Sequence, residues 1–573
     1  MASVTSKGPS WLASSWGAYA GVALLSGLIN VLYLSGSIFM LEVYDRVLPS
    51  RSIPTLIGLA AITAALYAFQ GLFDLCRGRI LSRIGATLDR ELSQDVFQAV
   101  LRQPLRSRVD GDGQQPLRDL DQVKAFLASG GPAALFDLPW MPLYLAVCFA
   151  FHAWIGLAAL GGALFLVAVT LLTDALTRHA TRSAVGAAAV RNRITESGRR
   201  NAEVVRALGM ARRIGARWDD ANSRHMTFQQ RASDVSGGFG ALTKVTRMLL
   251  QSAILGIGAY LVIDGQATGG IMIASSILTS RALAPVELAI ANWRGFVGAR
   301  QGWRRLQQVL GAEAAPGARL KLPAPRLSLS VENAAVVAPG QGRLLVQEIS
   351  FSLKTGQGVG VIGPSGSGKS SLARLLVGIW PACRGKIRLD GAALDHWLDE
   401  DLGAYLGYLP QDVELFAGTV TENIARFDPA ADAGHVIAAA KAANVHDLIL
   451  RLPDGYETEI GESGAALSAG QRQRIGLARA LFRDPFLVVL DEPNSNLDAE
   501  GDTALTQAIL GVRARGGIVV VVAHRPSALA GVDMILMMDG GRAQAFGPKD
   551  EVLSRVTRPV SLPAAAVLKA VEN

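Results

Sequence analysis

The first half of the chain contains six stretches of apolar, almost uncharged residues, most of them about as long as a bilayer is thick. A membrane-spanning helix needs about 20 such residues, and in lipid a helix satisfies its own backbone polar groups. Half of the 573 residues are hydrophobic and only 18% are charged, against about 25% in soluble proteins. The sequence therefore predicts six spanning helices, at 17–40, 53–73, 135–150, 154–172, 248–263 and 271–290.

The polar links between these stretches alternate in length and charge. The first, third and fifth are short and poor in lysine and arginine, and the first is expected to be a polar turn at 42–51. The second link, and the fourth at 178–247, are long and rich in arginine. Basic loops are retained in the cytoplasm, so both long links and both chain ends are expected there. Apolar spacing at 81–101 and 202–214 predicts helices that continue out of the membrane.

Ionisable residues at membrane depth are costly, so each needs an explanation. Those concerned are Asp74, Asp137, Asp174, Arg281 and Glu287. Asp74 and Asp174 are expected near an interface, paired or snorkelling. For Asp137, Arg281 and Glu287 two interpretations stay open: a polar surface on a transport path, or the same pairing near an interface. Two prolines within 138–142 are expected to bend the third span.

The net charge of +8 does not by itself indicate a nucleic-acid ligand, because the basic residues fall mostly in the links between apolar stretches. We therefore expect no nucleic-acid partner. The three cysteines, Cys76, Cys148 and Cys383, are far apart in the sequence and lack metal-ligand spacing. Residues 1–16 lack the apolar core and cleavage site of a signal peptide, and we expect them to be a cytoplasmic segment.

The second half of the chain has a different composition. A stretch rich in Pro, Gly and Ala at 306–325 predicts a linker between a transmembrane domain at 17–305 and a second domain at 326–560, with a tail at 561–573. The second domain contains Gly363-Pro-Ser-Gly-Ser-Gly368-Lys369-Ser370, between an apolar strand at 358–362 and a helix. This pattern in this context is the P-loop, which binds the phosphates of a nucleotide.

The residue types of the P-loop suit that chemistry. The backbone amides of a glycine-rich turn and the positive end of the following helix attract an anion. Lys369 is expected to reach the β- and γ-phosphates of ATP, and the Ser370 hydroxyl to bind Mg²⁺. The residues predicted to bind the nucleotide here are Gly363, Pro364, Ser365, Gly366, Ser367, Gly368, Lys369, Ser370 and Ser371.

Two carboxylates follow the continuous apolar run at 486–490, which is typical of a buried parallel strand. Asp491 and Glu492 would therefore lie at the carboxyl end of a strand, where open α/β sheets bind ligands. Asp491 is predicted to support Mg²⁺, and Glu492 to orient or deprotonate the attacking water. Together with the P-loop, these acids predict an ATPase.

Several segments resemble the ATP-binding-cassette (ABC) proteins. Leu467-Ser-Ala-Gly-Gln471 is similar to the LSGGQ signature of that family, with Ala469 in place of the first glycine. Gln411 resembles the glutamine of the Q-loop, 495–498 the D-loop, and His524 the switch histidine, while 459–464 resembles a segment that exporters carry ahead of the signature. The implied fold is an α-helical transmembrane domain of the type I ABC exporter kind, followed by an α/β P-loop cassette.

The resemblance implies roles for these residues. The catalytic residues would be Glu492, His524 and Gln411, and the metal would be held by Ser370, Gln411 and Asp491. Ser468, Gly470, Gln471 and Asp498 would complete the nucleotide site of a second chain. Because the chain carries one cassette and six spans, a two-fold homodimer with two competent sites is expected.

One position departs from the family pattern. The family usually stacks a tyrosine on the adenine, but no aromatic residue occurs between Leu327 and Ser350. Val337 or Ala338 is expected to meet the base instead, with weaker stacking and weaker base selectivity.

Longer matches resemble one branch of the exporters. The segments 42–51, 407–420, 491–498 and 544–548 look like the permease-ATPase of bacterial type I secretion, in the branch that exports proteases and RTX proteins. The resemblance implies a multi-pass protein of the bacterial inner membrane with a cytoplasmic cassette. Its substrate would be an unfolded secreted protein with a C-terminal signal. Its partners would be a periplasmic membrane-fusion adaptor and an outer-membrane channel.

Two alternatives stay open: a lipid or small-molecule exporter of the same architecture, and a membrane-tethered ATPase that regulates rather than transports. With no cysteine or histidine in 1–16, leader cleavage by the chain is not expected. A cytoplasmic entrance lined by arginines such as Arg77, Arg79 and Arg83 would suit acidic, calcium-binding cargo. The cargo, the adaptor and the ATP-to-transport ratio are not specified by the sequence.

Overall fold

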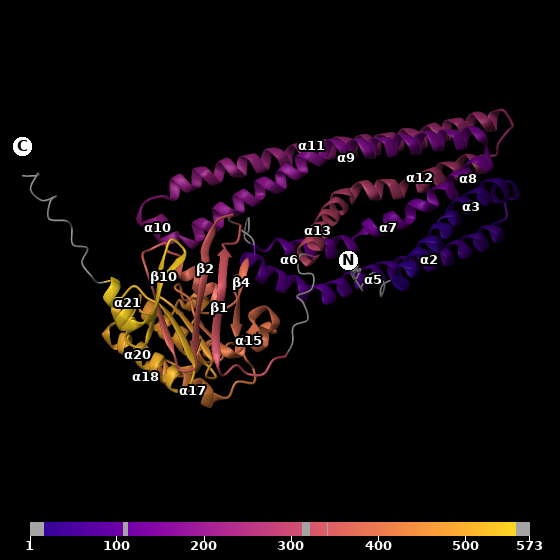
Figure 1. Cartoon of the computed structure of the whole chain (residues 1–573). Coiled ribbons are helices and arrows are strands. Elements are labelled where there is room, and N and C mark those ends of the chain that lie inside the picture. The colour runs from indigo at the N-terminus through magenta and orange to yellow at the C-terminus, as the bar shows by residue number, and fades with distance from the viewer. Residues whose placement is uncertain (1–15, 107–112, 312–320, 341, 557–573) are drawn as a thin grey trace, which may run out of the picture. The chain divides into compact units, whose positions relative to one another are not determined.

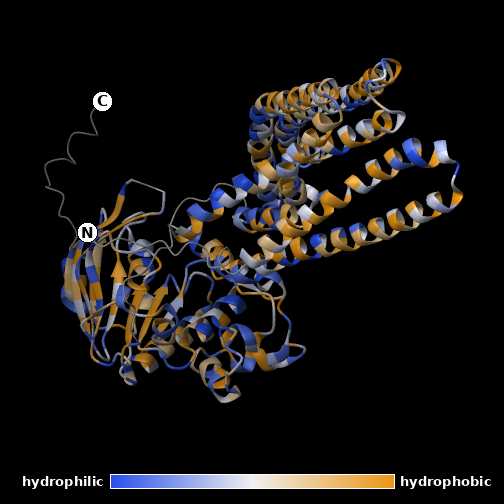
Figure 2. Ribbon diagram, turned by 90° about the vertical axis from the view of Figure 1, so that its right-hand side faces the viewer, coloured by the Kyte–Doolittle hydropathy of each residue, from blue (hydrophilic) through white to orange (hydrophobic). Residues whose placement is uncertain are grey.

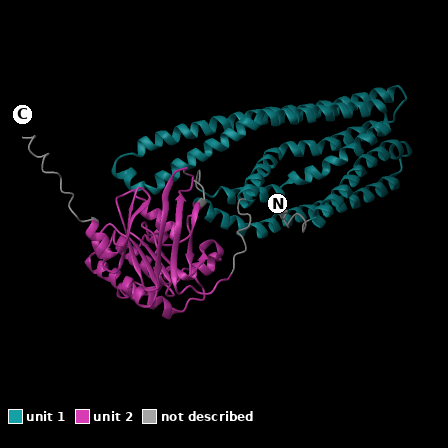
Figure 3. Cartoon of the chain, viewed as in Figure 1, with its two compact units in different colours: residues 1–104, 109–314 teal, residues 105–108, 315–573 magenta. Residues whose placement is uncertain are grey.

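The computed structural model describes residues 16–106, 113–311, 321–340 and 342–556. The chain divides into two compact units (Figure 3): residues 1–104 with 109–314, and residues 105–108 with 315–573. The predicted segment at 1–16, apart from its last residue, the predicted tail at 561–573 and the middle of the predicted linker lie outside the described residues.

Unit 1 is a bundle of long helices (Figure 1). Among the described residues, six helical segments are long and apolar enough to cross a membrane, which confirms the six predicted spans. Their helices are α2 (Trp16–Leu32) with α3 (Leu34–Glu42), α5 (Ile53–Arg106), α7 (Gly130–Asp137) with α8 (Met141–Phe151), α9 (Ala153–Arg200), α11 (Ala211–Ile263) and α12 (Gly269–Ala291).

Three of these helices extend far beyond a bilayer. At a rise of about 1.5 Å per residue, the 54 residues of α5 cover roughly 80 Å, against about 30 Å of hydrocarbon. The arginine-rich links are therefore helical continuations of the spans, as expected, and α9 and α11 run side by side (Figure 1). The helix predicted at 202–214 is interrupted, because α10 (Ala202–Ala207) ends before α11 begins.

Two further helices complete the second link and the end of unit 1. They are α6 (Gln115–Leu127) and α13 (Trp293–Gly311). The two pack together, and the buried Asp119 accepts two hydrogen bonds from the Arg305 guanidinium, at 2.8 Å and 2.6 Å. Since α13 runs to Gly311, the first part of the segment expected to be a linker is helical instead.

The prediction of a polar turn at 42–51 is wrong for most of that segment. The chain stays helical through a π-helical turn, η1 (Val43–Val47), and α4 (Leu48–Ser50), and it reverses at Arg51, whose φ is 51°. Within η1, the Asp45 carboxylate accepts hydrogen bonds from the Thr268 hydroxyl at 2.5 Å and the Gly270 amide at 2.8 Å. This carboxylate caps α12, so it joins the ends of the first and sixth spans.

The third span is bent where the prolines predicted a bend. A 3₁₀ turn, η2 (Leu138–Trp140), separates α7 from α8. The next link is as short as expected: His152 alone is extended, and α9 begins at Ala153.

Most of the intramembrane charges are paired. Asp137 is buried and accepts hydrogen bonds from the buried Arg77, at 2.8 Å and 3.0 Å, and from Asn30 at 2.8 Å. The exposed Asp74 pairs with the same arginine at 2.6 Å. Because Arg77 is buried and held by these two acids, it does not line a cytoplasmic entrance as the sequence suggested, whereas Arg79 is exposed.

The other three charges are held near the sixth span. Asp174 pairs with Arg178 at 2.7 Å and accepts a hydrogen bond from the Trp293 indole at 2.7 Å. Glu287 lies 2.8 Å from Arg247. The Arg281 guanidinium lies over the Tyr33 ring, 4.5 Å from its centroid, and has no carboxylate partner within the described part of the chain.

Unit 2 is an α/β domain with two sheets. A four-stranded antiparallel sheet has the order β2-β1-β4-β5, and a six-stranded sheet has the order β10-β9-β3-β8-β7-β6. The strands are β1 (Ser328–Val337), β2 (Leu344–Lys354), β3 (Gly358–Ile362), β4 (Arg384–Leu389), β5 (Ala392–Ala393), β6 (Leu406–Leu409), β7 (Leu487–Asp491), β8 (Ile518–Val522), β9 (Met534–Asp539) and β10 (Arg542–Pro548).

The inner strands of the larger sheet are parallel and buried on both faces. In β7, Val488 and Leu490 pack into one hydrophobic core, and Leu487 and Val489 pack into the other. This alternation follows from the two-residue period of a strand, and it explains why the strand reads as a continuous apolar run. Figure 2 shows these strands as largely hydrophobic. The adjoining strands β6 and β8 run parallel to β7 on either side of it.

Candidate functional site

The P-loop joins β3 to α14 (Lys369–Leu376), as the sequence predicted. Because β3, β8, β7 and β6 are consecutive in the sheet and parallel, their carboxyl ends share one edge. The P-loop, His524, the acids Asp491 and Glu492, and Gln411 follow these four strands in that order. The sheet topology therefore brings together residues that are far apart in the sequence.

Two glycines of the P-loop are required by its backbone. A Cβ on Gly363 would overlap the carbonyl oxygen of Met538. Gly366 has a φ of 78°, and no atom lies within 4 Å of the position where its Cβ would be. The loop therefore leaves an open cradle of the kind in which backbone amides hold a phosphate.

The Lys369 ammonium lies inside this cradle. It is almost fully buried and donates hydrogen bonds to the carbonyl oxygens of Gly363 at 2.9 Å and Pro364 at 2.8 Å. Burial lowers the pKa of Lys369, an effect that the nearby Glu492 and Asp491 oppose. A bound phosphate chain would supply the negative charge that this buried cation lacks.

Ser370 and Asp491 form the second part of the site. The Ser370 hydroxyl donates to Asp491 Oδ1 at 3.0 Å, and Asp491 Oδ2 is buried without a partner in the described chain. Burial raises the pKa of Asp491, and the neighbouring Glu492 acts in the same direction. An unpaired carboxylate oxygen beside a hydroxyl suits Mg²⁺, which prefers few protein ligands and takes the rest from phosphates and water.

Glu492 lies just beyond β7 with a φ of 50°, a left-handed conformation that is unusual for glutamate. Its carboxylate is held from both sides. Oε2 accepts a hydrogen bond from Gln411 Nε2 at 3.1 Å, and Oε1 lies 3.0 Å from His524 Nε2. The structure thus brings the three predicted catalytic residues together. Gln411 contacts Glu492, and its predicted contact with a metal stays a prediction.

The segment that resembles the signature begins a helix. This helix is α19 (Ala469–Leu481), which has Ser468 as its N-cap. Gln471 completes a capping box: its amide donates to the Ser468 hydroxyl at 3.3 Å, and its side chain accepts from the Ser468 amide at 2.8 Å. Within the described residues, no hydrogen bond or ion pair joins Ser468, Gly470 or Gln471 to the P-loop of the same chain.

Asp498 and Val337 lie at the margins of the site. Asp498 is the N-cap of α20 (Ala499–Ala514), where its carboxylate accepts from the Gly501 amide at 2.8 Å. That hydrogen bond, with Arg474, lowers the pKa of Asp498. Val337 is half-buried at the end of β1, and the adjacent Ala338 is buried. Their predicted contacts with a nucleotide stay predictions.

Comparisons with known proteins agree with this geometry. The family models "ABC transporter transmembrane region" and "ABC transporter" match residues 20–285 and 346–495. The type I secretion system ATP-binding protein PrsD of Rhizobium meliloti (strain 1021) is 58% identical over 97% of this chain and 95% of its own length. This chain belongs to the ABC transporters.

More distant relatives are also ABC proteins. The cyclolysin secretion/processing ATP-binding protein CyaB of Bordetella pertussis is 29% identical to this transporter, over 93% of this chain and 75% of its own length. A solved structure of a bacterial Atm1-family ABC exporter with ATP bound superposes with a TM-score of 0.82, at 25% identity, over 95% of this chain and 97% of that one. The comparisons favour a type I secretion protein over the lipid or small-molecule alternative.

The transporter is therefore an ATP-hydrolysing, multi-pass membrane protein. Two polar residues of α19 that belong to none of the predicted motifs contact the loop that follows Glu492. The buried Gln473 donates to the Pro493 carbonyl and accepts from the Asn496 amide at 3.1 Å, and Arg474 pairs with Asp498 at 2.8 Å. A polar residue on the buried face of a helix was the available signal, because such groups are hydrogen-bonded in folded proteins.

Proposed function

We propose that this transporter is the inner-membrane ATPase of a type I secretion system and that it exports an unfolded protein with a C-terminal secretion signal. The observation that supports this most strongly is the 58% identity to a type I secretion ATP-binding protein along almost the whole of both chains. The assembled hydrolysis site supports the ATPase part independently, because it rests on contacts within this chain.

In the proposed reaction, the P-loop residues 363–371 bind the phosphates of ATP. Lys369 neutralises charge on the β- and γ-phosphates. Ser370 and Asp491, with Gln411, would hold Mg²⁺, which would offset the charge that develops on the transferred phosphoryl group. Glu492 accepts a proton from the attacking water, or orients it, and Gln411 and His524 fix the direction in which the carboxylate points.

The nucleotide is proposed to lie between two copies of the chain. Ser468 and Gly470 head α19, whose positive end can face the γ-phosphate bound by the other copy. The Ala469 methyl removes no donor, since glycine offers no side-chain donor. Asp498 would act at the same interface through its contact with Arg474. Closure of the two cassettes around ATP would then shift the spans from inward to outward access, and hydrolysis would reset them.

The proposed partners follow from the secretion system. A periplasmic membrane-fusion adaptor and an outer-membrane channel would carry the cargo onward, and the cassette would face the cytoplasm. Within the described second link, Arg79 and Arg83 are exposed and could contact an acidic cargo. Arg77 is buried and could not.

A secretion assay tests this proposal. Cells that lack the gene would be complemented with wild-type protein, Glu492→Gln or the control Glu500→Gln, an exposed glutamate at the start of α20. We expect wild type and Glu500→Gln to restore export of a protein with a C-terminal signal. Glu492→Gln should reach the membrane and bind ATP, but leave the cargo inside the cells. Undiminished export in cells that lack the gene would contradict the proposal.

A further inference from the structure

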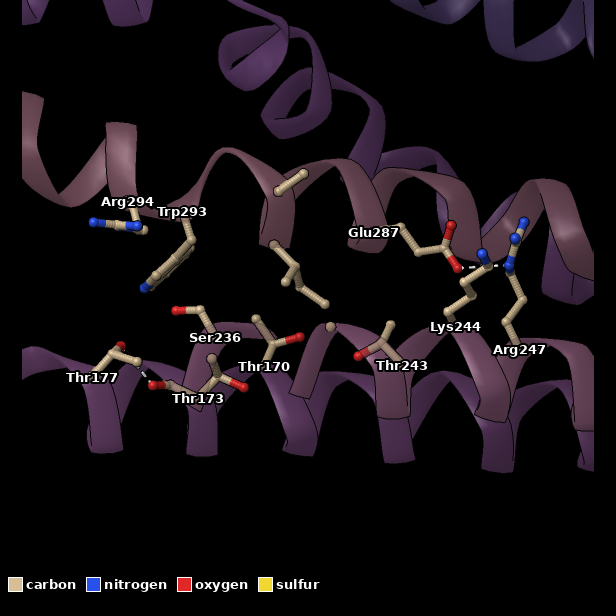
Figure 4. Close-up of a pocket in the computed structure, with 13 residues that line it drawn as sticks. Thr170, Thr173, Thr177, Ser236, Thr243, Lys244, Arg247, Glu287, Trp293 and Arg294 are labelled. Carbon is tan, nitrogen blue, oxygen red and sulfur yellow. Dashed lines mark hydrogen bonds and ion pairs between the residues drawn. The ribbon is translucent and has the colours of Figure 1, made fainter. Parts of the chain in front are cut away.

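A pocket of about 410 Å³ lies within unit 1, and none of its lining residues is proposed for ATP hydrolysis (Figure 4). It is bounded by α9, α11 and the junction between α12 and α13. Its polar lining consists of Thr170, Thr173, Thr177, Ser236, Thr243, Lys244, Arg247, Glu287, Trp293 and Arg294. Such a polar lining is unusual between membrane-spanning helices, and polar groups at membrane depth mark functional sites.

The depth of the pocket can be derived from the helices that line it. At about 1.5 Å per residue, Glu287 is roughly 27 Å from the start of α12, and Lys244 is roughly 28 Å from the end of α11. Thr173 is roughly 30 Å from the start of α9 by the same measure. Since the hydrocarbon core is about 30 Å thick, the three helices place the pocket at the cytoplasmic edge of the membrane. That is the level of the phosphates of the inner leaflet.

The charges around the pocket favour an anion. Three cations, Lys244, Arg247 and Arg294, face one carboxylate, Glu287, which leaves an excess of two positive charges (three minus one). The carboxylate is already engaged by Arg247 at 2.8 Å. Lys244 and Arg294 are exposed, and no ion pair is seen for either one in the described parts of the chain. In Figure 4, Lys244 lies at one end of the pocket and Arg294 at the other.

The carboxylate that contacts Trp293 of the lining does not cancel this charge. Asp174 lies on α9 next to the pocket, but it pairs with Arg178 at 2.7 Å and accepts the Trp293 indole proton at 2.7 Å. The same hydrogen bond fixes Trp293 at the pocket wall. Tryptophan is enriched at the level of lipid headgroups, so its position agrees with the depth derived from the helices.

The hydroxyl groups of the lining further restrict which kinds of ligand the pocket can bind. Thr170, Thr173 and Thr243 donate to carbonyl oxygens of their own helices, at 2.8 Å, 2.7 Å and 2.9 Å. Their oxygens can therefore only accept a hydrogen bond from a ligand in the pocket. A headgroup that carries both a phosphate and free hydroxyls matches this lining, because the phosphate meets the cations and its hydroxyls donate to the threonines.

We propose that this pocket binds the headgroup of an anionic, glycerol-bearing phospholipid of the inner leaflet, with Lys244 and Arg294 attracting its negative charge from the two ends of the pocket. Basic pockets between helices on the cytoplasmic side are known to hold such headgroups. A lipid bound there would bridge α9, α11 and α12. The inference concerns the membrane domain alone and does not depend on the identity of the cargo.

Lipid titration of the purified full-length transporter tests the proposal. Native mass spectrometry would count short-chain phosphatidylglycerol bound per chain, with short-chain phosphatidylcholine, a zwitterion without net charge, as the comparison. We expect saturable binding of phosphatidylglycerol that is several-fold tighter than that of phosphatidylcholine. Each of Lys244→Gln and Arg294→Gln should weaken it roughly fivefold, and the double variant roughly 25-fold.

The matched control is Arg231→Gln, which removes an exposed cation from the same helix, α11, outside the pocket lining. It should leave phosphatidylglycerol binding unchanged. Equal binding of both lipids, or an equal loss in the control, would overturn the proposal. So would displacement of the lipid by inorganic phosphate at low concentration, because the pocket would then select a free anion. Lipid binding that is unchanged in the double variant while an acidic cargo peptide loses affinity would assign the pocket to cargo instead.

Discussion

At the scale of single residues, Asp491 combines a functional position with a cost to stability. Its side chain is fully buried, and one of its two carboxylate oxygens has no partner in the described chain. Burial raises the pKa of Asp491, so the ionised form is disfavoured in the folded protein. A buried acid with one unpartnered carboxylate oxygen is consistent with a cation site, since binding of a cation to the native state compensates the cost.

This leads to a prediction for Asp491→Asn. Because the pKa of the folded state is raised above its unfolded value, the wild-type protein loses stability as the pH rises through that pKa. The variant removes this loss. Without nucleotide or metal at neutral pH, we expect Asp491→Asn to be more stable by about 1–3 kcal/mol and inactive as an ATPase. Thermal unfolding from acidic to neutral pH would measure this, and the difference should shrink as the pH falls. A variant that melts below wild type at neutral pH would contradict the argument.

The base of the nucleotide gives a second prediction. Val337 is half-buried at the end of β1, and an aliphatic side chain offers no aromatic surface to a purine. Stacking on an aromatic side chain contributes about 1–3 kcal/mol per base. We therefore expect Val337→Tyr to tighten ATP binding by roughly fivefold or more, while Val337→Leu does not. Competition against a fluorescent nucleotide would measure both, and equal affinities for the Tyr and Leu variants would count against a base at this position.

Residues with local signatures could be predicted from the sequence. The P-loop, Asp491 and Glu492 each follow an apolar strand, so their positions at one sheet edge were predictable. The contacts of Gln473 were not, because its partners Pro493 and Asn496 are in a turn whose path depends on the packing of α19.

At the scale of elements, a buried ion pair joins the first three spans. Arg77 on α5 and Asp137 on α7 are both buried, and Asn30 on α2 donates to the same carboxylate. Removing one partner of such a pair leaves an uncompensated charge, whereas replacing both with apolar residues is often neutral. The pair therefore makes the association of these helices depend on both charges.

We predict that Asp137→Ala destabilises the protein by about 3–5 kcal/mol, measured as a lowered melting temperature in detergent. The double variant Arg77→Met with Asp137→Leu should recover most of the loss. Asp74→Asn is the matched control, because the Asp74 side chain is 59% exposed and its pairing with Arg77 is worth little. If Asp137→Ala had the same melting temperature as Asp74→Asn, the ion pair between Arg77 and Asp137 would not stabilise the protein.

The elements themselves were largely predictable, because a run of about 20 apolar residues has few alternatives to a spanning helix. The π-helical turn at η1 was not. The polar residues around Asp45 resemble a surface turn, and only the distant Thr268 and Gly270, which Asp45 caps, explain why the chain stays helical there. Likewise, the burial of Arg77 follows from Asp137, which lies 60 positions away in the sequence.

At the scale of the whole molecule, the two units divide the work: unit 1 spans the membrane and unit 2 carries the hydrolysis site. Within the described part of unit 2, Ser468 and Gly470 make no hydrogen bond to the P-loop. We propose that the start of α19, which the capping box with Ser468 and Gln471 stabilises, binds the nucleotide of the partner chain. The central claim is therefore that each ATP is held by Lys369 of one chain and Ser468 of the other.

Pairs of differently tagged chains, all carrying Glu492→Gln to retain ATP, test this claim most directly. Ser468→Asp is suited to the test because aspartate also caps a helix, while its charge repels the γ-phosphate. In the first pairing, one chain carries Lys369→Ala and the other Ser468→Asp, which leaves one complete shared site. In the second pairing, one chain carries both changes, which leaves none. The account predicts tightly retained ATP in the first pairing only; retention in the second pairing and none in the first would contradict it.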